Sequence, residues 1–340
     1  MYMKNKVICL LFLLTTTFAF ANKSFTTDGE VVTSDVKDQA YIYVGNSPYW
    51  GGSQPHVDLI VDKNVSFTGF QYLNIYDTNS VTFKGGNTVS GGQISLSANS
   101  SLYATNTTFN LTTFDMGGAN NAKAEIIGGV FNVDRLGVID SASIVFDGVS
   151  GKIGSMTKRG AVNGGEESLF NMTLKNGSSM EVSPAYLGAL CANVYLESGS
   201  SLTVGTKLNT GTEIVVGSGC SMTVKGDLTT TKSLTVASDA TISASGFNFE
   251  KLTITFDEDF TADSDVSFNL EDIFGDQAGL VLSALEAGDF TVSGNNGEFS
   301  ASIDGGTIHI DTQVIPEPAT VAVIFGIFAL GLAAYRKRSK

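Results

Sequence analysis

Apolar and polar residues alternate in short runs along most of the chain. Residues 81–83, 94–96 and 144–146 read Val-Thr-Phe, Ile-Ser-Leu and Ile-Val-Phe, and Gly, Asn and Ser separate many such runs. Alternation at a period of two, interrupted by residues that favour turns, is typical of short β-strands. Long amphipathic helical patterns do not occur between the two ends of the sequence. The pattern therefore predicts an all-β fold.

The apolar positions also recur at a longer interval. Two sets repeat every 20 residues, and a companion set follows each of them two residues later. The first set and its companions are Val194, Ile214, Leu234 and Ile254, with Leu196, Val216, Val236 and Phe256. The second set and its companions are Leu202, Met222 and Ile242, with Val204, Val224 and Ala244. Upstream the interval loosens to 21 residues from Val81 to Leu102 and 22 from Met180 to Leu202.

Two short strands in each unit of roughly 20 residues predict a parallel β-helix, that is, a β-solenoid. One such coil cannot bury its own inward side chains, but stacked coils form a continuous apolar column. The alternative is an antiparallel β-sandwich, for which turns about 8–12 residues apart would also be natural. The recurrence at 20 residues favours the solenoid, because a sandwich does not require it.

The pattern divides the chain into four parts. Residues 1–21 are expected to be a signal peptide, 22–256 the solenoid, 257–314 an acidic terminal β cap and 315–340 a sorting tail with one transmembrane helix. Within the cap, 295–297 and 304–306 are expected to be hairpin turns, and a short helix is expected near 278–287. Residues 25–60 are expected to cap the other end of the solenoid.

Charge restricts the partners of the part between the two ends. Of the 34 acidic and 20 basic residues, one and six lie outside residues 22–315, which leaves 33 and 14 and a net charge of −19. From residue 252 to 315 there are 13 carboxylates and no Lys or Arg. A strongly acidic surface argues against nucleic acid or anionic lipid as a partner.

Both ends of the chain carry targeting features. Two lysines, an apolar segment 7–18 and the sequence Ala19-Phe20-Ala21 before Asn22 have the order of a cleavable signal peptide. At the other end, residues 319–335 carry no charge and are long enough, at about 25 Å of helix, to span a bilayer. A basic cluster follows, so the C-terminus is expected in the cytoplasm.

The C-terminal tail resembles the PEP-CTERM sorting signals of bacterial envelope proteins. The residues that match are Pro316, Glu317, Pro318, Arg336, Lys337 and Arg338, in the expected order around the apolar segment. The resemblance covers the tail alone and implies processing by an exosortase, delivery to the surface of a Gram-negative bacterium and association with extracellular polysaccharide. It implies no activity for the rest of the chain.

Candidate catalytic and metal-binding residues are few. Asp134 and Arg135, with Asp140 and Asp147, form the best patch for a polysaccharide lyase or hydrolase, although neighbouring Asp and Arg usually form a solvated ion pair. No metal site or cofactor is expected. A weak calcium candidate is the acidic segment that contains Asp257, Asp259, Asp263 and Asp265, since carboxylates are the ligands that Ca²⁺ prefers.

Other residues have both structural and functional interpretations. Tyr41, Tyr43, Tyr49 and Trp50 either cover the first coil or stack on sugar rings. Cys191 and Cys220 are out of phase with a 20-residue coil, so buried thiols are favoured over a disulfide. The two histidines, His56 and His309, are expected in a loop and on an outward strand position.

The sequence therefore predicts an exported, non-enzymatic structural or adhesive protein of the cell surface. Its precursor would be held in the inner membrane by residues 319–335 and processed by an exosortase. The alternative is a polysaccharide lyase or hydrolase on the same scaffold, which a groove with several carboxylates and a basic residue would favour.

Overall fold

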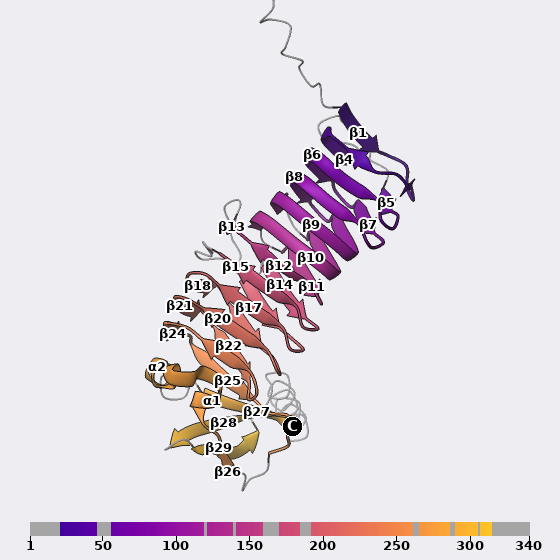
Figure 1. Cartoon of the computed structure of the whole chain (residues 1–340). Coiled ribbons are helices and arrows are strands. Elements are labelled where there is room, and N and C mark those ends of the chain that lie inside the picture. Colours follow the sequence, from indigo (N-terminus) through magenta and orange to yellow (C-terminus); the bar gives the residue numbers. More distant parts are fainter. Residues whose placement is uncertain are drawn as a thin grey trace, which may run out of the picture. The chain divides into compact units, whose positions relative to one another are not determined.

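The computed structural model describes residues 21–45, 56–118, 121–138, 141–158, 170–183, 192–260, 265–285, 290–304 and 307–314. This part of the chain is all-β, about 6% helical, with a β-solenoid of about nine turns (Figure 1). It divides into two compact units, and the boundary falls within β11 (Ser143–Asp147). Unit 1 holds the residues up to 144 with 150–154, and unit 2 holds 145–149, 155–158 and the later residues.

Each turn of unit 1 contributes to three rows of parallel strands. The first row contains β2 (Val31–Val32), β5 (Asp58–Val61), β7 (Ser80–Phe83) and the first parts of β9 (Ser101–Gly118) and β10 (Lys123–Val138). The second contains β3 (Val36–Lys37), the first parts of β6 (Ser66–Ile75) and β8 (Thr88–Ser97), the middle of β9 and β10, and β12 (Ser150–Ile153). The third contains β1 (Ala21–Phe25), β4 (Gln39–Val44) and the ends of β6, β8, β9 and β10.

Unit 2 repeats the three-row arrangement with shorter strands. Its first row contains β14 (Phe170–Lys175), β16 (Ala192–Leu196), β19 (Glu213–Val216), β22 (Ser233–Ala237), β25 (Lys251–Thr255) and β27 (Phe290–Gly294). Its second contains β15 (Ser179–Val182), β17 (Ser201–Val204), β20 (Ser221–Val224) and β23 (Thr241–Ser243). Its third contains β18 (Leu208–Thr210), β21 (Asp227–Thr230) and β24 (Gly246–Asn248), and β13 (Met156–Lys158) also belongs to this unit.

These pairings confirm the solenoid, because strands of successive turns run parallel along every row. The expected 20-residue register is confirmed for Val194 with Ile214 and for Leu202 with Met222. The upstream intervals are also confirmed, since Met180 pairs with Leu202 and Val81 with Leu102.

Two details of the predicted coil were wrong. A turn has three strand rows rather than two. The third row of unit 2, where the 20-residue repeat lies, contributes only three or four residues per strand, so its alternation is too short to recognise. In the last repeat Leu234 pairs with Leu252 and not with Ile254. The segment that precedes β25 is two residues shorter than in the turns before it, and the alternation continues over both registers, so the apolar pattern alone could not choose between them.

The inward positions build an apolar column in each unit. In unit 1, buried phenylalanines contact one another from turn to turn, with ring centroids 5.7 Å apart for Phe67 and Phe83, 5.9 Å for Phe83 and Phe109, and 5.8 Å for Phe109 and Phe131. Edge-on contacts of this kind are favourable for aromatic rings beyond the area that they bury. The column explains why the inward positions are apolar in every turn.

The segment after β25 covers one end of unit 2. The helices α1 (Leu270–Phe274) and α2 (Ala278–Ala284), joined by the short 3-10 helix η2 (Gly275–Gln277), pack near β23 and β24, and the ring of Phe274 meets that of Phe247 at 5.4 Å. Antiparallel strands follow, with β27 paired to β28 (Gly297–Asp304), β28 to β29 (Thr307–Val314), and β29 to β26 (Asp265–Ser267). The expected hairpins and the helix near 278–287 are confirmed.

The expected N-terminal cap over residues 25–60 was wrong. β1 pairs in parallel with β4, β2 with β5 and β3 with β6, so residues 21–44 form the first turn of the solenoid itself. The expected signal peptide, apart from Ala21, and the tail 315–340 lie outside the described residues.

Candidate functional site

An outward hollow of about 440 Å³ lies on unit 1, over the second strand row. The positions that face outward there are stacked in register, since Ser90 pairs with Asn110, Asn110 with Asn132, and Asn132 with Lys152. The full lining consists of Ser90, Gly91, Asn110, Leu111, Thr112, Asn132, Val133, Asp134, Lys152 and Gly154. Four successive turns therefore build one surface from the same position of the coil.

The hollow combines polar walls with an apolar floor. The Asn132 side-chain amide donates to the Asn110 side-chain oxygen at 3.1 Å, and the Thr112 hydroxyl donates to the Gly92 carbonyl at 2.8 Å. Leu111 and Val133 are almost fully buried and present their remaining surface to the hollow. This arrangement suits a ligand that has both hydroxyl groups and apolar faces.

Two glycines of the lining lie close to the backbone of the preceding turn. A Cβ atom at Gly154 would lie 2.6 Å from the Asp134 carbonyl oxygen, and one at Gly91 would lie 2.6 Å from the Phe70 carbonyl oxygen. Real side chains do not tolerate such contacts with backbone, so these positions accept no larger residue without a shift of the neighbouring turn. The two glycines are thus required where neighbouring turns pack closely at the hollow.

The predicted enzymatic patch is only partly assembled at this hollow. Asp134 lines it and Arg135 does not, and the Arg135 Nε atom is buried without a hydrogen-bond partner among the described residues. Asp147 belongs to unit 2, where it pairs with Lys175 at 3.3 Å and accepts a hydrogen bond from Asn176 at 2.7 Å. Asp140 lies outside the described residues. One carboxylate and one ammonium group, those of Asp134 and Lys152, therefore belong to the lining.

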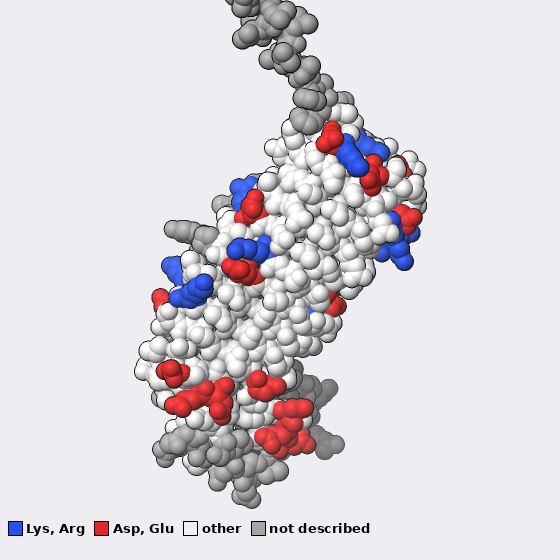
Figure 2. Space-filling view, in the orientation of Figure 1, with Lys and Arg blue, Asp and Glu red and all other residues white. Residues whose placement is uncertain are grey.

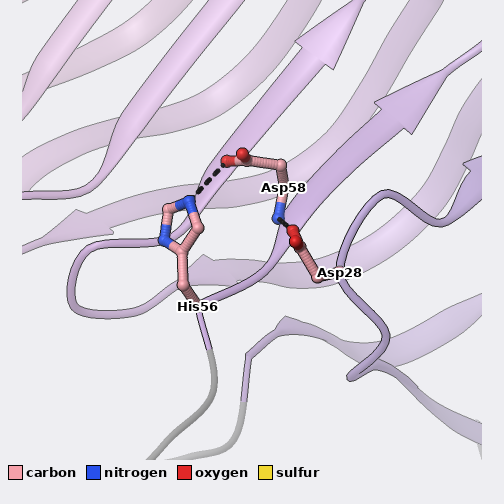
Figure 3. A group of neighbouring side chains, drawn as sticks. All are labelled: Asp28, His56 and Asp58. Atoms are coloured by element: carbon pink, nitrogen blue, oxygen red, sulfur yellow. Dashed lines mark hydrogen bonds and ion pairs between the residues drawn. The ribbon is translucent and has the colours of Figure 1, made fainter.

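A second cluster on unit 1 brings together Asp28, His56 and Asp58 (Figure 3). One ligand atom from each residue lies within 4.8 Å of the other two. The His56 Nε2 atom lies 3.0 Å from the Asp58 Oδ1 atom, and the Asp58 N–H donates to the Asp28 Oδ1 atom at 3.0 Å. Sequence reasoning missed this cluster, because Asp28 is 30 residues from Asp58; the His-x-Asp spacing of His56 and Asp58 was the one local signal.

The acidic segment proposed for calcium is only partly described. Asp257 and Asp259 are exposed, Asp263 lies outside the described residues, and the side chain of Asp265 is likewise not described. Among the residues that the structure describes, Asp28, His56 and Asp58 form the one group of three potential metal ligands. On the face drawn in Figure 2, red carboxylates gather near the C-terminal end of unit 2, in agreement with the absence of Lys and Arg from residues 252–315.

Two residues of the predicted aromatic cluster, Tyr41 and Tyr43, stack with two further tyrosines. The rings of Tyr41 and Tyr72 are stacked with centroids 5.1 Å apart, Tyr41 and Tyr43 at 5.8 Å, and Tyr43 and Tyr76 at 6.2 Å. Burial, and then the neighbouring Tyr41, raise the pKa of Tyr43. Tyr49 and Trp50 lie outside the described residues. The register of β4 with β6 brings Tyr72 beside Tyr41, which a single strand could not reveal.

Cys220 is a buried free thiol, as expected. It occupies the corner position that Ser178 and Ser200 hold in earlier turns, where the Ser201 and Ser221 N–H groups bond to the carbonyls of those serines. Burial raises the pKa of the Cys220 thiol. Cys191 lies outside the described residues. His309 is exposed in β29, as the sequence predicts.

No protein-family model, curated protein or solved structure was found to match this chain. Within the described ranges, no helix is both long and apolar enough to cross a bilayer. The expected span 319–335 lies outside those ranges.

Proposed function

We propose that the chain is an exported structural or adhesive protein of the cell surface, whose solenoid contacts extracellular polysaccharide through the outward hollow of unit 1. The observation that carries the proposal is the composition of that hollow, in which amide and hydroxyl groups from successive turns stand over Leu111 and Val133. Amides bond sugar hydroxyls in either direction, and an apolar floor suits the CH faces of a sugar ring.

The charge of the chain restricts the kind of polysaccharide that it could bind. A net charge of −19 over residues 22–315 repels polyanions at low ionic strength. The hollow itself contributes one carboxylate and one ammonium group. These charges support a neutral, hydroxyl-rich polysaccharide over an acidic one.

The proposal includes export of the protein and processing of both ends of the chain. Cleavage after Ala21 would leave Asn22–Phe25 paired with β4, so removal of the signal peptide is compatible with the first turn. The tail, with Pro316, Glu317 and Pro318 before the apolar segment and Arg336, Lys337 and Arg338 after it, would then deliver the protein through an exosortase. The precursor is single-pass, with its C-terminus in the cytoplasm, before it reaches the cell surface or matrix.

The binding proposal is tested with purified full-length protein in mild detergent on an array of neutral and acidic glycans. Asn132→Ala removes a hollow amide, and its matched control is Asn171→Ala, which removes a similar cross-turn bond of 2.9 Å to Asn193 in unit 2. We expect retention on neutral glycans to fall about five- to tenfold in the first variant, as the loss of one or two hydrogen bonds implies, and to persist in the control. Absence of retention by the wild-type protein, or equal loss in both variants, would contradict the proposal.

A polysaccharide lyase or hydrolase remains the second candidate, because Asp134 and Lys152 both line the hollow. A carboxylate and an amine over a bound sugar could supply acid and base groups. A reducing-sugar assay and an unsaturated-product assay on the retained glycans test this. Product that disappears in Asp134→Asn and Lys152→Met supports an enzyme, whereas retention without product supports the adhesive role.

A further inference from the structure

In the cluster of Asp28, His56 and Asp58, one pair of atoms has the spacing that a metal ion requires and the third residue lies nearby. Two ligand atoms held about 2.0–2.2 Å from one Zn²⁺ ion, at angles of about 90–110°, lie about 2.8–3.6 Å apart. The His56 Nε2 and Asp58 Oδ1 atoms are 3.0 Å apart, and a ligand atom of Asp28 lies within 4.8 Å of both groups. A small movement of the Asp28 side chain would complete a three-ligand face.

The backbone holds His56 and Asp58, at the start of β5, on one face. Val57, between them, is fully buried, and its N–H donates to the Asn79 Oδ1 atom at 2.7 Å. Because successive side chains of an extended segment point to opposite sides, His56 and Asp58 both face outward. Figure 3 shows the imidazole of His56 pointing toward the Asp58 carboxylate.

Hydrogen bonds also orient the carboxylates. The Ser80 hydroxyl, from the next turn, donates to the Asp58 Oδ1 atom at 2.5 Å. The Gly29 N–H donates to the Asp58 carbonyl at 3.1 Å, which fixes the turn that carries Asp28 against the start of β5. Such partners of ligand groups typically strengthen metal binding by restricting the ligands.

We infer that Asp28, His56 and Asp58 form a surface site for a divalent transition-metal ion such as Zn²⁺. Imidazole favours Zn²⁺ and similar ions over the hard cations Ca²⁺ and Mg²⁺, which prefer sites built of oxygen alone. The His56 and Asp58 side chains are 52% and 50% exposed, which leaves room for water in the remaining coordination positions. The ion would fasten the turn after β1 to the following turn of the solenoid. This inference is independent of the proposed glycan binding, because none of its three ligands lines the hollow.

The test is titration of Zn²⁺ alone into the full-length protein, followed by calorimetry and by NMR of the imidazole protons. The chain has only two histidines, so His56 and His309 give two signals that variants assign directly. We expect Zn²⁺ to perturb the His56 signal and to leave that of His309 unchanged. Ca²⁺ and Mg²⁺ are expected to perturb neither.

Three variants accompany the titration. His56→Ala and Asp28→Asn should each weaken Zn²⁺ binding about tenfold or more, while His309→Ala should bind as the wild type does. The side-chain oxygen of an Asn at position 28 can still accept the hydrogen bond from Asp58, so this variant tests the lost charge while the turn is retained. Zn²⁺ binding that is unchanged in His56→Ala and Asp28→Asn, or heats that Ca²⁺ reproduces with no change at His56, would overturn the site in favour of non-specific binding to an acidic surface.

Discussion

Asparagine and glycine alternate at one corner of unit 1. Asn64, Gly86, Asn106 and Gly128 have φ angles of 61°, 66°, 44° and 65°, a left-handed conformation that Asn and Gly adopt most readily. A Cβ atom at Gly86 would lie 2.1 Å from the Asn64 Oδ1 atom, and one at Gly128 would lie 2.3 Å from that of Asn106. Each asparagine side chain thus lies over the glycine of the next turn, and the two residue types depend on each other.

Gly128→Ala should therefore lower the unfolding free energy by more than the cost of placing an alanine in the left-handed conformation. We expect a left-handed alanine to cost about 1–2 kcal/mol and displacement of the Asn106 side chain from its rotamer to add about 0.5–1.5 kcal/mol. The control is Gly177→Ala, which has a φ of 74° and open space around its Cβ position, so that only the first cost applies. Urea unfolding monitored by circular dichroism gives both values.

A double variant checks the cause of this difference. Asn106→Gly combined with Gly128→Ala removes the side chain that the new methyl group would meet. Its unfolding free energy should recover the steric part of the loss and retain the cost of the left-handed alanine. No recovery, after allowance for Asn106→Gly alone, would mean that the asparagine is not the obstacle.

Individual site residues were predictable only where the chain itself places them together. Asp134 was a candidate from sequence and does line the hollow, whereas its neighbour Arg135 does not. Asn110 and Asn132 come from different turns and meet through strand register. Without that register, no pattern in either segment identifies them as neighbours.

Strands were the most predictable elements, because alternation marks them locally. In the two longer rows of unit 2, the pairings from β16 to β22 and from β17 to β23 follow from apolar positions 20 residues apart, as Ile214 with Leu234 illustrates. The third row was missed because β18 and β21 each bury few residues, among them Leu208 and Leu228. The α1 helix was also missed, since five residues carry too little periodicity to be recognised.

The phenylalanine column should dominate the stability of the strands in unit 1. Phe109 is fully buried and contacts two other rings, so Phe109→Ala should cost about 3–5 kcal/mol. Tyr103 lies on the same strand, but it is 41% exposed. Tyr103→Ala should therefore change the unfolding free energy by about 0.5 kcal/mol or less. Denaturant unfolding compares the two, and similar losses would show that ring contacts do not concentrate stability in the column.

At the scale of the whole molecule, the proposed route of export predicts the mass of the mature protein. Mass spectrometry of the surface fraction should show a form that begins at Asn22 and lacks residues 336–340, because an exosortase would remove the basic end. Replacement of Pro316, Glu317 and Pro318 by alanines should leave the precursor in the inner-membrane fraction. A surface form with an intact C-terminus would instead indicate a permanent anchor.

The repeated corner in unit 2 makes the solenoid adjustable in length. Ser200 and Cys220 hold equivalent positions, and β17 and β20 follow them in the same register. Removal of residues 201–220 would thus join Ser200 to Ser221 and set β20 on β15, with one turn fewer and a reach shorter by about 4.8 Å, the spacing of paired strands. Gain or loss of whole turns can therefore alter the length of the solenoid without a new core, so length can vary independently of the residues that line the hollow.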